Sequence, residues 1–350
     1  MERSYNRRKF IRDTTLAGVA LGISRSGNAA LQFSSRSKKL NEVETGKRIG
    51  IIGLDTSHSV AFTEALNDPL ADKAFAGFKV VAAYPKGSND IQSSVERIKD
   101  YTEKVKSLGV EIVSSIAELL TKVDVVLLET NDGRLHLEQA LQVLKAGKRM
   151  FIDKPLAASL ADVIKIFDAA RNYHVDIFSS SSLRFIPGAK EIKEGKIGNV
   201  LGADTYSPAT IEKTHPDLFW YGIHGVELLY TVMGTGCEKV SRIYSEKTDI
   251  VIGTWKDGRI GTYRGMRWGK PDFGGTVFGE KANSALGQWE GYKPLLIEII
   301  RFFQTGAAPV SEHETLDIYA FMEAADESKR NGGSEVSIDK TLQRAGLGPK

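Results

Sequence analysis

The sequence predicts an α/β protein: an N-terminal Rossmann domain with a doubly wound parallel sheet, followed by a C-terminal α+β domain with a mixed, largely antiparallel sheet. From residue 47 onward, continuous apolar runs alternate with segments of helical periodicity, which is typical of a parallel sheet covered on both faces. Over residues 240–288, apolar and polar residues alternate and the segments break at Asp-Gly and Gly-Gly, as in antiparallel hairpins. We expect a leader and linker over 1–46, the Rossmann domain over 47–156 and the α+β domain with closing helices over 157–340.

The first domain is expected to follow the strand-helix alternation closely. Its strands are short, apolar and rich in β-branched residues, whereas its helices carry apolar residues three and four apart. Sheets of this kind bind ligands at the carboxyl ends of their strands. The expected strands cover 48–54, 78–84, 111–113, 123–130 and 149–155, and the expected helices cover 59–68, 89–108, 114–122 and 135–147.

The second domain begins with a helix, after which the regular alternation of strands and helices ends. A strand, a short helix that stops at a glycine and another strand precede the hairpins, and two apolar-striped helices close the chain. An antiparallel sheet with helices on one face exposes the other, so this face is a candidate association surface for a dimer or tetramer. These elements cover 160–173, 176–185, 187–198, 199–208, 294–306 and 315–330.

Charge and composition describe an ordinary globular chain with a basic leader. Of 350 residues, 41% are hydrophobic and 26% are charged, which excludes a disordered composition. The formal charge is +3, but residues 1–46 hold nine Lys and Arg against four Asp and Glu, so the remainder is slightly acidic. Overall charge therefore gives no support to nucleic-acid binding.

The N-terminus resembles a twin-arginine export signal. Arg7 and Arg8 precede Phe10 and a weakly apolar run too short to span a bilayer, and small residues near Ala29 suit cleavage. Cys237 is the only cysteine, so the product can form no internal disulfide. We therefore expect a periplasmic or otherwise exported protein, folded before export and with no membrane span in the mature chain.

The stretch GKRMFIDKPLAAS, residues 147–159, resembles the Gfo/Idh/MocA oxidoreductase family. The similarity rests on Asp153-Lys154-Pro155 after a strand, with a helix containing His136 before it, and it extends over about 47–335. It implies a nicotinamide-binding Rossmann domain joined to an α/β substrate domain, with Lys154 at the family's catalytic lysine. An ammonium beside a substrate hydroxyl can relay its proton and polarise the developing carbonyl.

A second similarity lies in HPDLFWYGIHGVELLYTVMG, residues 215–234. His224 matches the family's acid/base histidine, and Trp220 stands where many members carry its aspartate partner. Tyr221 precedes His224 by three residues, as in some relatives that include a nicotinamide-dependent glycosidase branch, and both are expected to face one pocket from a single helical turn. Tyr221 can donate a hydrogen bond while a near-neutral imidazole takes the hydroxyl proton. Arg184, His215 and Trp220 add polar and aromatic groups suited to a sugar ring.

The phosphate loop departs from the expected Gly-x-Gly-x-x-Gly. Gly53 is kept, but Asp55 and His58 replace the two glycines that let the backbone approach pyrophosphate and the helix pack closely. Thr56 or Ser57 can cap the helix or donate to phosphate, and Asp55 can itself turn away as the cap. The loop therefore either holds a dinucleotide in an altered way or has been repurposed for another ligand.

The cofactor expectation is NAD or NADP. The segment after the second strand lacks the acidic residue that holds ribose hydroxyls, and Lys86 there suits a 2′-phosphate. The loop before His136 differs from the family pattern, and Asp55, His58 and Glu129 match no dedicated metal spacing, so no metal is predicted. The cofactor-binding candidates are Gly53, Asp55, Thr56, Ser57, His58, Lys86, Glu129, Asn131, His136, Asp153 and Lys154.

These residues favour an exported NAD(P)-dependent oxidoreductase that moves a hydride at a secondary alcohol of a sugar or sugar derivative. Lys154 and His224 would manage the hydroxyl proton and Tyr221 would orient the substrate. The same residues permit a nicotinamide-retaining glycosidase or lyase, because hydride removal at one sugar carbon acidifies its neighbour. The altered phosphate loop permits a third hypothesis for the function, a sugar-binding relative without a cofactor.

Overall fold

Sheet A, in the computed structural model, has six parallel strands in the order β3-β2-β1-β4-β5-β6. This is the Rossmann order, and the connection reverses direction between β1 and β4. The structure describes residues 46–270 and 272–348, so the expected export signal lies outside the described residues. The strands are β1 Arg48–Ile52, β2 Lys79–Tyr84, β3 Glu111–Ile112, β4 Val125–Leu128, β5 Met150–Ile152 and β6 Ile177–Phe178.

Helices cover both faces of sheet A. In β1, Ile51 packs with residues of α1 and α9, whereas the neighbouring Ile52 packs on the opposite face with residues of α3, α4 and α5. Alternate side chains of a strand point to opposite faces, so a doubly covered strand is apolar throughout. The helices are α1 Ser57–Asn67, α2 Gln92–Ser107, α3 Ile116–Lys122, α4 Gly133–Lys145, α5 Leu160–Tyr173 and α9 Lys293–Thr305, with a 3₁₀ turn η1 at Lys73–Phe75.

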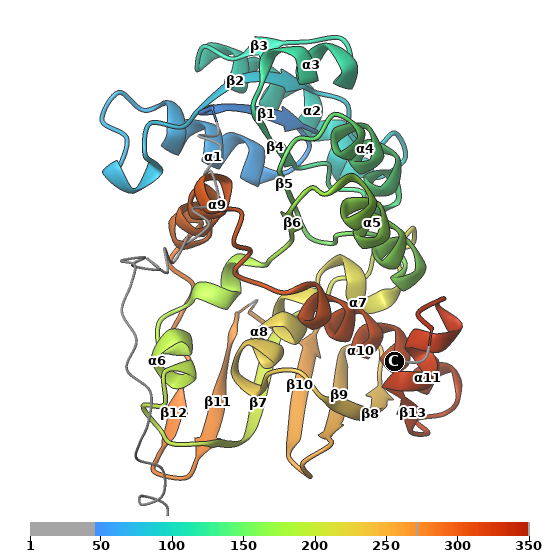
Figure 1. Ribbon diagram of the computed structural model, residues 1–350. Helices are drawn as coiled ribbons and strands as arrows, with labels where there is room; N and C mark the ends of the chain where they lie inside the picture. The colour runs from blue at the N-terminus through green and yellow to red at the C-terminus, as the bar shows by residue number, and fades with distance from the viewer. Residues whose placement is uncertain (1–45, 271, 349–350) are drawn as a thin grey trace, which may run out of the picture. The chain divides into compact units, whose positions relative to one another are not determined.

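Sheet A continues beyond residue 156, where the sequence suggested that the first domain ends. The helix α5 crosses over from β5 to β6, and Phe178 of β6 pairs with Phe151 of β5 in parallel register. Near the other end of the chain, α9 returns to the first sheet and lies beside α1 (Figure 1). The Rossmann layer therefore combines segments from both halves of the sequence.

Sheet B has seven strands in the order β12-β11-β7-β10-β9-β8-β13. The pair β7 and β10 is parallel and the other pairs are antiparallel, so the expected mixed, largely antiparallel sheet is confirmed. The strands are β7 Val200–Pro208, β8 Cys237–Tyr244, β9 Thr248–Trp255, β10 Ile260–Met266, β11 Gly274–Gly279, β12 Asn283–Ala285 and β13 Val336–Ser337.

The helices of the second domain cover one face of sheet B. Every residue of α8 is buried, as expected for a helix that is apolar all round and packs between the sheet and α10. Along β9, buried side chains alternate with partly exposed ones, so the other face of the sheet is open. The remaining elements are η2 Ser182–Phe185, α6 Ala189–Lys193, α7 Asp217–Trp220, α8 Ile223–Met233, α10 Glu312–Arg330 and α11 Ile338–Arg344.

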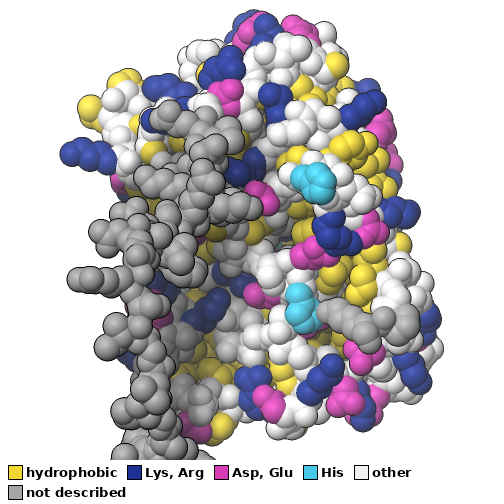
Figure 2. All heavy atoms as spheres, viewed as in Figure 1, with side chains coloured by type: hydrophobic (Ala, Val, Ile, Leu, Met, Phe, Trp, Pro, Cys, Tyr) yellow, Lys and Arg dark blue, Asp and Glu magenta, His cyan; other side chains and the backbone are white. Residues whose placement is uncertain are grey.

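The surface of the described residues carries charges of both signs. Figure 2 shows Lys and Arg interspersed with Asp and Glu over the visible face. Within the part of the chain that the structure describes, no helix combines the length and the apolar character that crossing a membrane requires.

Candidate functional site

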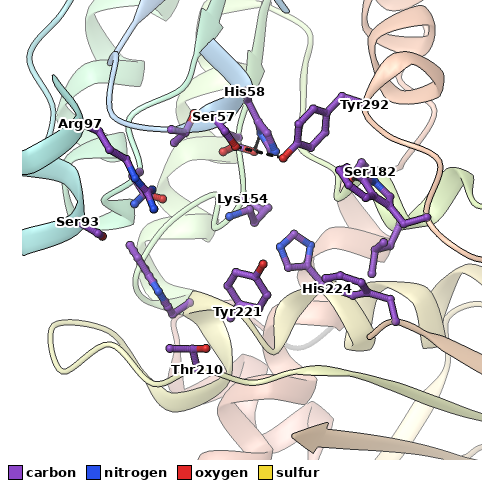
Figure 3. Close-up of a pocket in the computed structure, with 17 residues that line it drawn as sticks. Ser57, His58, Ser93, Arg97, Lys154, Ser182, Thr210, Tyr221, His224 and Tyr292 are labelled. Atoms are coloured by element: carbon purple, nitrogen blue, oxygen red, sulfur yellow. Dashed lines mark hydrogen bonds and ion pairs between the residues drawn. The ribbon is translucent and has the colours of Figure 1, made fainter. Parts of the chain in front are cut away.

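A cavity of about 450 Å³ lies where the carboxyl ends of β1, β4 and β5 face the start of α8. This is the edge of a Rossmann sheet at which ligands bind. Lys154 points into the cavity between His58 on one side and Tyr221 and His224 on the other (Figure 3). The predicted residues that line it are Thr56, Ser57, His58, Asn131, Asp153, Lys154, Trp220, Tyr221 and His224.

Lys154 is placed by the end of β5. The backbone N–H of the preceding Asp153 donates to the carbonyl of Leu128 at 2.8 Å, which continues the pairing of β5 with β4, and the following Lys154–Pro155 peptide bond is cis. The Lys154 side chain is only 9% exposed and lines the cavity. A largely desolvated ammonium in this position can stabilise negative charge that develops on a substrate oxygen.

His224 is held at the first turn of α8 with one ring nitrogen already engaged. Its Nδ1 lies 2.7 Å from Ser181 Oγ, which leaves Nε2 for a ligand. Ser181 is fixed in turn, because its backbone N–H donates to Glu227 Oε2 at 2.8 Å. Burial lowers the pKa of His224 well below its ordinary value, and the positive charges of Lys154 and His58 lower it further. His224 is therefore neutral at pH 7 and can accept a proton.

Tyr221 reaches the cavity from a break between helices. The structure differs here from the single helical turn expected from the sequence, because α7 ends at Trp220 and α8 begins at Ile223. The rings of Tyr221 and His224 still meet edge to face, with centroids 5.0 Å apart. Burial raises the pKa of Tyr221, so its hydroxyl stays protonated and can donate a hydrogen bond.

Arg184 lies outside the cavity and is not placed to bind a substrate. Its guanidinium is buried, with Nε donating to Glu227 Oε1 at 3.0 Å and Nη1 donating to Glu314 Oε1 at 2.6 Å. Buried charges require such pairing, so Arg184 orders the Glu227 carboxylate that positions Ser181. The aromatic and serine residues around it in the sequence gave no sign of these two partners.

His215 also lies outside the cavity. Its Nε2 accepts a hydrogen bond from the backbone N–H of Gly133 at 3.1 Å, at the start of α4, and its ring packs against Trp220. Burial lowers the pKa of His215 to about 4, although the charge of Asp132 opposes this. The neutral imidazole therefore joins the second domain to the first, while Trp220 beside it lines the cavity.

Asp55 bridges three loops at the edge of sheet A. Its Oδ1 accepts from the backbone N–H of Asn131 at 3.0 Å and its Oδ2 accepts from that of Ser88 at 3.2 Å. Gly87 makes room for this carboxylate, since a Cβ there would lie 2.2 Å from Asp55 Oδ2. The expected capping roles are not seen: Thr56 is the N-cap of α1 without a side-chain cap bond. Asp55 therefore ties the phosphate loop to the loops after β2 and β4.

His58 forms a buried cluster with Asp153 and Glu129. Its Nδ1 lies 3.0 Å from Asp153 Oδ1 and 3.7 Å from Glu129 Oε2. Burial opposes a charged imidazole, but the two carboxylates outweigh it and raise the pKa of His58 to about 9. Burial and the neighbouring Asp153 charge raise the pKa of Glu129 to about 7. His58 and Asp153 line the cavity, whereas Glu129 lies fully buried beside them.

The other predicted cofactor residues are spread over different environments. Gly53 has a φ of +90° and leaves no room for a Cβ, which would lie 2.4 Å from the backbone nitrogen of Thr130. His136 does not line a pocket as expected, because it is fully buried with its nitrogens 2.6 Å from the Thr130 carbonyl and 3.2 Å from that of Leu156. Lys86 lines a second cavity of about 260 Å³ beside β2 and α4.

Several cavity residues were missed by the sequence analysis. Arg97 comes from α2, and Trp289 and Tyr292 come from the segment that leads into α9. Tyr292 OH lies 3.2 Å from Ser57 Oγ (Figure 3), and its ring packs edge-on against His58. The aromatic residues of QWEGY, 288–292, were the one available signal, but nothing local indicated that they return to the first domain.

A nicotinamide dinucleotide fits this edge of sheet A at both of its ends. The larger cavity offers Lys154, Asn131 and the first turn of α1, including a buried Thr56 hydroxyl without a hydrogen-bond partner among the described residues. The smaller cavity with Lys86 can accept the adenosine end. The loop after β1 carries Asp55 where the usual pattern has a glycine, and this carboxylate accepts from the backbone N–H groups of Ser88 and Asn131. A bound dinucleotide would therefore meet a carboxylate in its phosphate loop.

Comparison with known proteins finds that the first domain is similar to a described family. Residues 47–180 match the Gfo/Idh/MocA model, described as an oxidoreductase family with an NAD-binding Rossmann fold. A myo-inositol 2-dehydrogenase of Thermotoga maritima is 26% identical over 220 residues, covering 59% of this chain and 60% of its own. A 1,5-anhydro-D-fructose reductase of Ensifer adhaerens is 33% identical over 100 residues, covering 27% and 30%. The chain thus spans less than two thirds of the length of these relatives.

Solved structures show the same fold over most of the chain. A probable dehydrogenase from Thermotoga maritima superposes with a TM-score of 0.69 at 21% identity, covering 84% of this chain and 99% of its own. A scyllo-inositol dehydrogenase from Lactobacillus casei, solved with NAD(H) and scyllo-inositol, gives a TM-score of 0.65 at 15% identity, covering 83% and 98%. The expected fold class is therefore confirmed.

Proposed function

We propose that this protein oxidises or reduces a secondary alcohol position of a sugar or polyol, because its residues 47–180 match the model of the Gfo/Idh/MocA oxidoreductase family with its NAD-binding Rossmann fold. The observation that carries the proposal is the meeting of Lys154, Tyr221 and His224 in one cavity. Relatives named for inositol and anhydrofructose substrates support a polyhydroxylated ligand.

The three side chains have different roles at the substrate oxygen that gains or loses a proton. Neutral His224 accepts the hydroxyl proton, Lys154 stabilises the charge that develops on the oxygen, and the Tyr221 hydroxyl donates a hydrogen bond that orients it. Trp220 and Trp289 offer aromatic faces to the apolar side of a sugar ring. A bound nicotinamide would supply the hydride acceptor or donor. Lys86 suits the 2′-phosphate of NADP. Binding of NAD and binding of NADP are therefore both measured.

Mass spectrometry and turnover assays test this function. The denatured protein should release about one equivalent of nicotinamide dinucleotide, or added NAD or NADP should raise its melting temperature. A polyol substrate should then yield stoichiometric reduced cofactor, and Lys154→Met or His224→Gln should slow turnover about 10²- to 10⁴-fold. Lys165→Met, on the exposed face of α5, is the matched control and should keep full activity. Full turnover by Lys154→Met would contradict the assignment.

The position of Asp55 favours a second candidate, a sugar-binding relative that has no dinucleotide. Its carboxylate puts a negative charge in the phosphate loop and is held there by two backbone N–H groups. Absence of bound nicotinamide, together with no thermal shift from NAD or NADP, would support this candidate. Glycosidic cleavage or elimination without net cofactor reduction would instead indicate the redox-neutral glycosidase or lyase.

We further propose that the protein is exported and that it forms a homo-oligomer. The Arg7-Arg8 signal supports twin-arginine export to the periplasm, which moves folded proteins that already hold their ligands. The open face of sheet B supports a homo-oligomer, either a dimer or a tetramer, because its outward side chains on β8, β9 and β10 include several isoleucines. Fractionation of cells that express the full chain tests the first point, and light scattering tests the second.

A further inference from the structure

Two departures from the family's sequence pattern meet in one place. His58 stands where the phosphate loop normally ends in glycine, and Glu129 directly follows β4, in the loop before His136 that differs from the family pattern. Both side chains converge on Asp153, the acid of the Asp-Lys-Pro triplet at the end of β5. The three residues therefore come from three neighbouring strand ends, which explains why no metal motif could be recognised from their spacing.

The separations suit ligands of one small cation. The Nδ1 of His58 lies 3.0 Å from Asp153 Oδ1 and 3.7 Å from Glu129 Oε2, and all three ligand atoms lie within 4.8 Å of one another. Two ligands that each bind an ion at about 2.1 Å are roughly 3.0 to 3.4 Å apart in octahedral or tetrahedral geometry. Small adjustments of these side chains would bring all three atoms to bonding distance.

The Glu129 carboxylate supplies an independent indication of a ligand. It is fully buried, and neither of its oxygens has a hydrogen-bond partner among the described residues. Asp153 Oδ2 is buried without a partner in the same way. Buried carboxylates are ordinarily paired, hydrogen-bonded or bound to metal, because an unpaired charge is costly away from water. Three carboxylate oxygens without a hydrogen-bond partner, beside one imidazole, are what a cation site offers.

Packing fixes the imidazole in this orientation. The ring of His58 stacks on Phe62 with centroids 5.5 Å apart and meets the edge of Tyr292 at 4.4 Å. These two rings hold the imidazole with its Nδ1 toward the carboxylates. Both His58 and Asp153 line the large cavity, so an ion held by them would also be open to a ligand there.

We propose that His58, Glu129 and Asp153 bind a transition-metal dication whose open positions face the cavity beside Lys154. An imidazole together with two carboxylates favours Zn²⁺ or Mn²⁺ over Ca²⁺, which prefers oxygen ligands alone. The two negative charges balance the dication once the proton on His58 has left. The ion would coordinate a hydroxyl or carbonyl oxygen of a polyhydroxylated ligand and so place that oxygen near Lys154.

Metal binding can be measured without substrate or cofactor, so its outcome is separate from that of the proposed function. The full chain is purified without chelator, stripped with EDTA and then mixed with Zn²⁺ or Mn²⁺. Elemental analysis should show about one ion per chain after removal of excess metal, and the ion should raise the melting temperature. Absence of bound metal and of any thermal shift with both ions would overturn the proposal.

Variants test whether these residues are the ligands. Glu129→Gln should lose the bound ion and the metal-dependent thermal shift, while circular dichroism reports whether the variant is folded. Asp55→Asn removes a neighbouring buried carboxylate that is not part of the cluster and should retain both. Undiminished metal binding by folded Glu129→Gln would overturn the site. Equal melting temperatures of the wild type with and without metal would show that the cluster holds only a proton.

Discussion

The carboxylate of Asp55 accepts a hydrogen bond from the backbone N–H of Asn131 at 3.0 Å, and this contact spans the edge of sheet A between the loops after β1 and β4. In a Rossmann domain the backbone N–H groups at the start of the helix after β1 ordinarily bind the phosphates of a dinucleotide. Here the loop that leads into this helix carries a carboxylate at Asp55.

Replacing this carboxylate should tighten dinucleotide binding. Asp55→Gly removes a negative charge from the phosphate loop and restores the glycine of the usual pattern. Because a like charge beside a phosphate opposes binding, we expect the Kd for NAD or NADP to fall about tenfold or more. Isothermal titration measures this change without any turnover.

The isosteric Asp55→Asn is the control for charge alone and should give a smaller improvement. The melting temperature of each free variant should be recorded as well, because loss of the bridge between loops lowers stability. Weaker binding of NAD and NADP by Asp55→Gly than by the wild type would show that the carboxylate assists the cofactor.

Glu227 should matter more for stability than an ordinary acidic residue. It accepts from Arg184, from Ser180 Oγ and from the backbone N–H of Ser181, all of them buried. Glu227→Ala leaves the Arg184 charge short of a partner, so we expect a loss of about 3 to 5 kcal/mol in the free energy of unfolding. Urea denaturation measures it.

An exposed ion pair provides the comparison for Glu227. The pair of Glu298 with Arg301 lies on the surface of α9, and Glu298→Ala should cost less than about 1 kcal/mol. Similar losses in the two variants would mean that the buried network around Arg184 adds no more than a surface pair.

Local periodicity was enough to predict both sheets. Strands such as β4 and β9 differ in their apolar pattern, continuous in one and alternating in the other, and this difference reflects burial on two faces or on one. The Asp-Lys-Pro stretch located Lys154 correctly at a strand end because the strand, the turn and the residue are contiguous in the sequence.

Features that depend on distant contacts could not be predicted. Tyr292 enters the cavity only because α9 crosses back to sheet A, and Arg184 is removed from it by Glu227 and Glu314. The sequence predicted that His215 binds a sugar, but in the structure its ring accepts a hydrogen bond from the N–H of Gly133. Residue type indicates what a side chain can do, but only the fold decides which partner it meets.

His215 should make the protein less stable in mild acid. Burial lowers its pKa in the folded state to about 4, whereas in the unfolded chain it is about 6.5. The unfolded state therefore binds more protons between these values, and stability falls as the pH drops from about 6.5 toward 4. His215→Gln keeps an acceptor for Gly133 and cannot be protonated, so its unfolding free energy should fall less over this range. Parallel curves for wild type and variant would exclude His215 as the cause.

The open face of sheet B should mediate association between copies of this chain. On its outward side, Ile243 of β8 lies directly opposite Ile250 of β9, and Ile243 and Ile260 are 65% and 54% exposed. Apolar side chains gathered on one sheet face favour burial against a second copy. We expect the wild type to be a dimer or tetramer by light scattering and the double variant Ile243→Glu with Ile260→Glu to be a monomer.

A matched surface change separates this effect from a general one. Leu70 is 91% exposed in the loop after α1, away from sheet B, and Leu70→Glu should keep the mass of the wild type. Because the outward isoleucines contribute little to the core, the melting temperature of the double variant should fall only by the stability that association provides. A monomeric wild type, or a double variant of unchanged mass, would show that this face does not join the subunits.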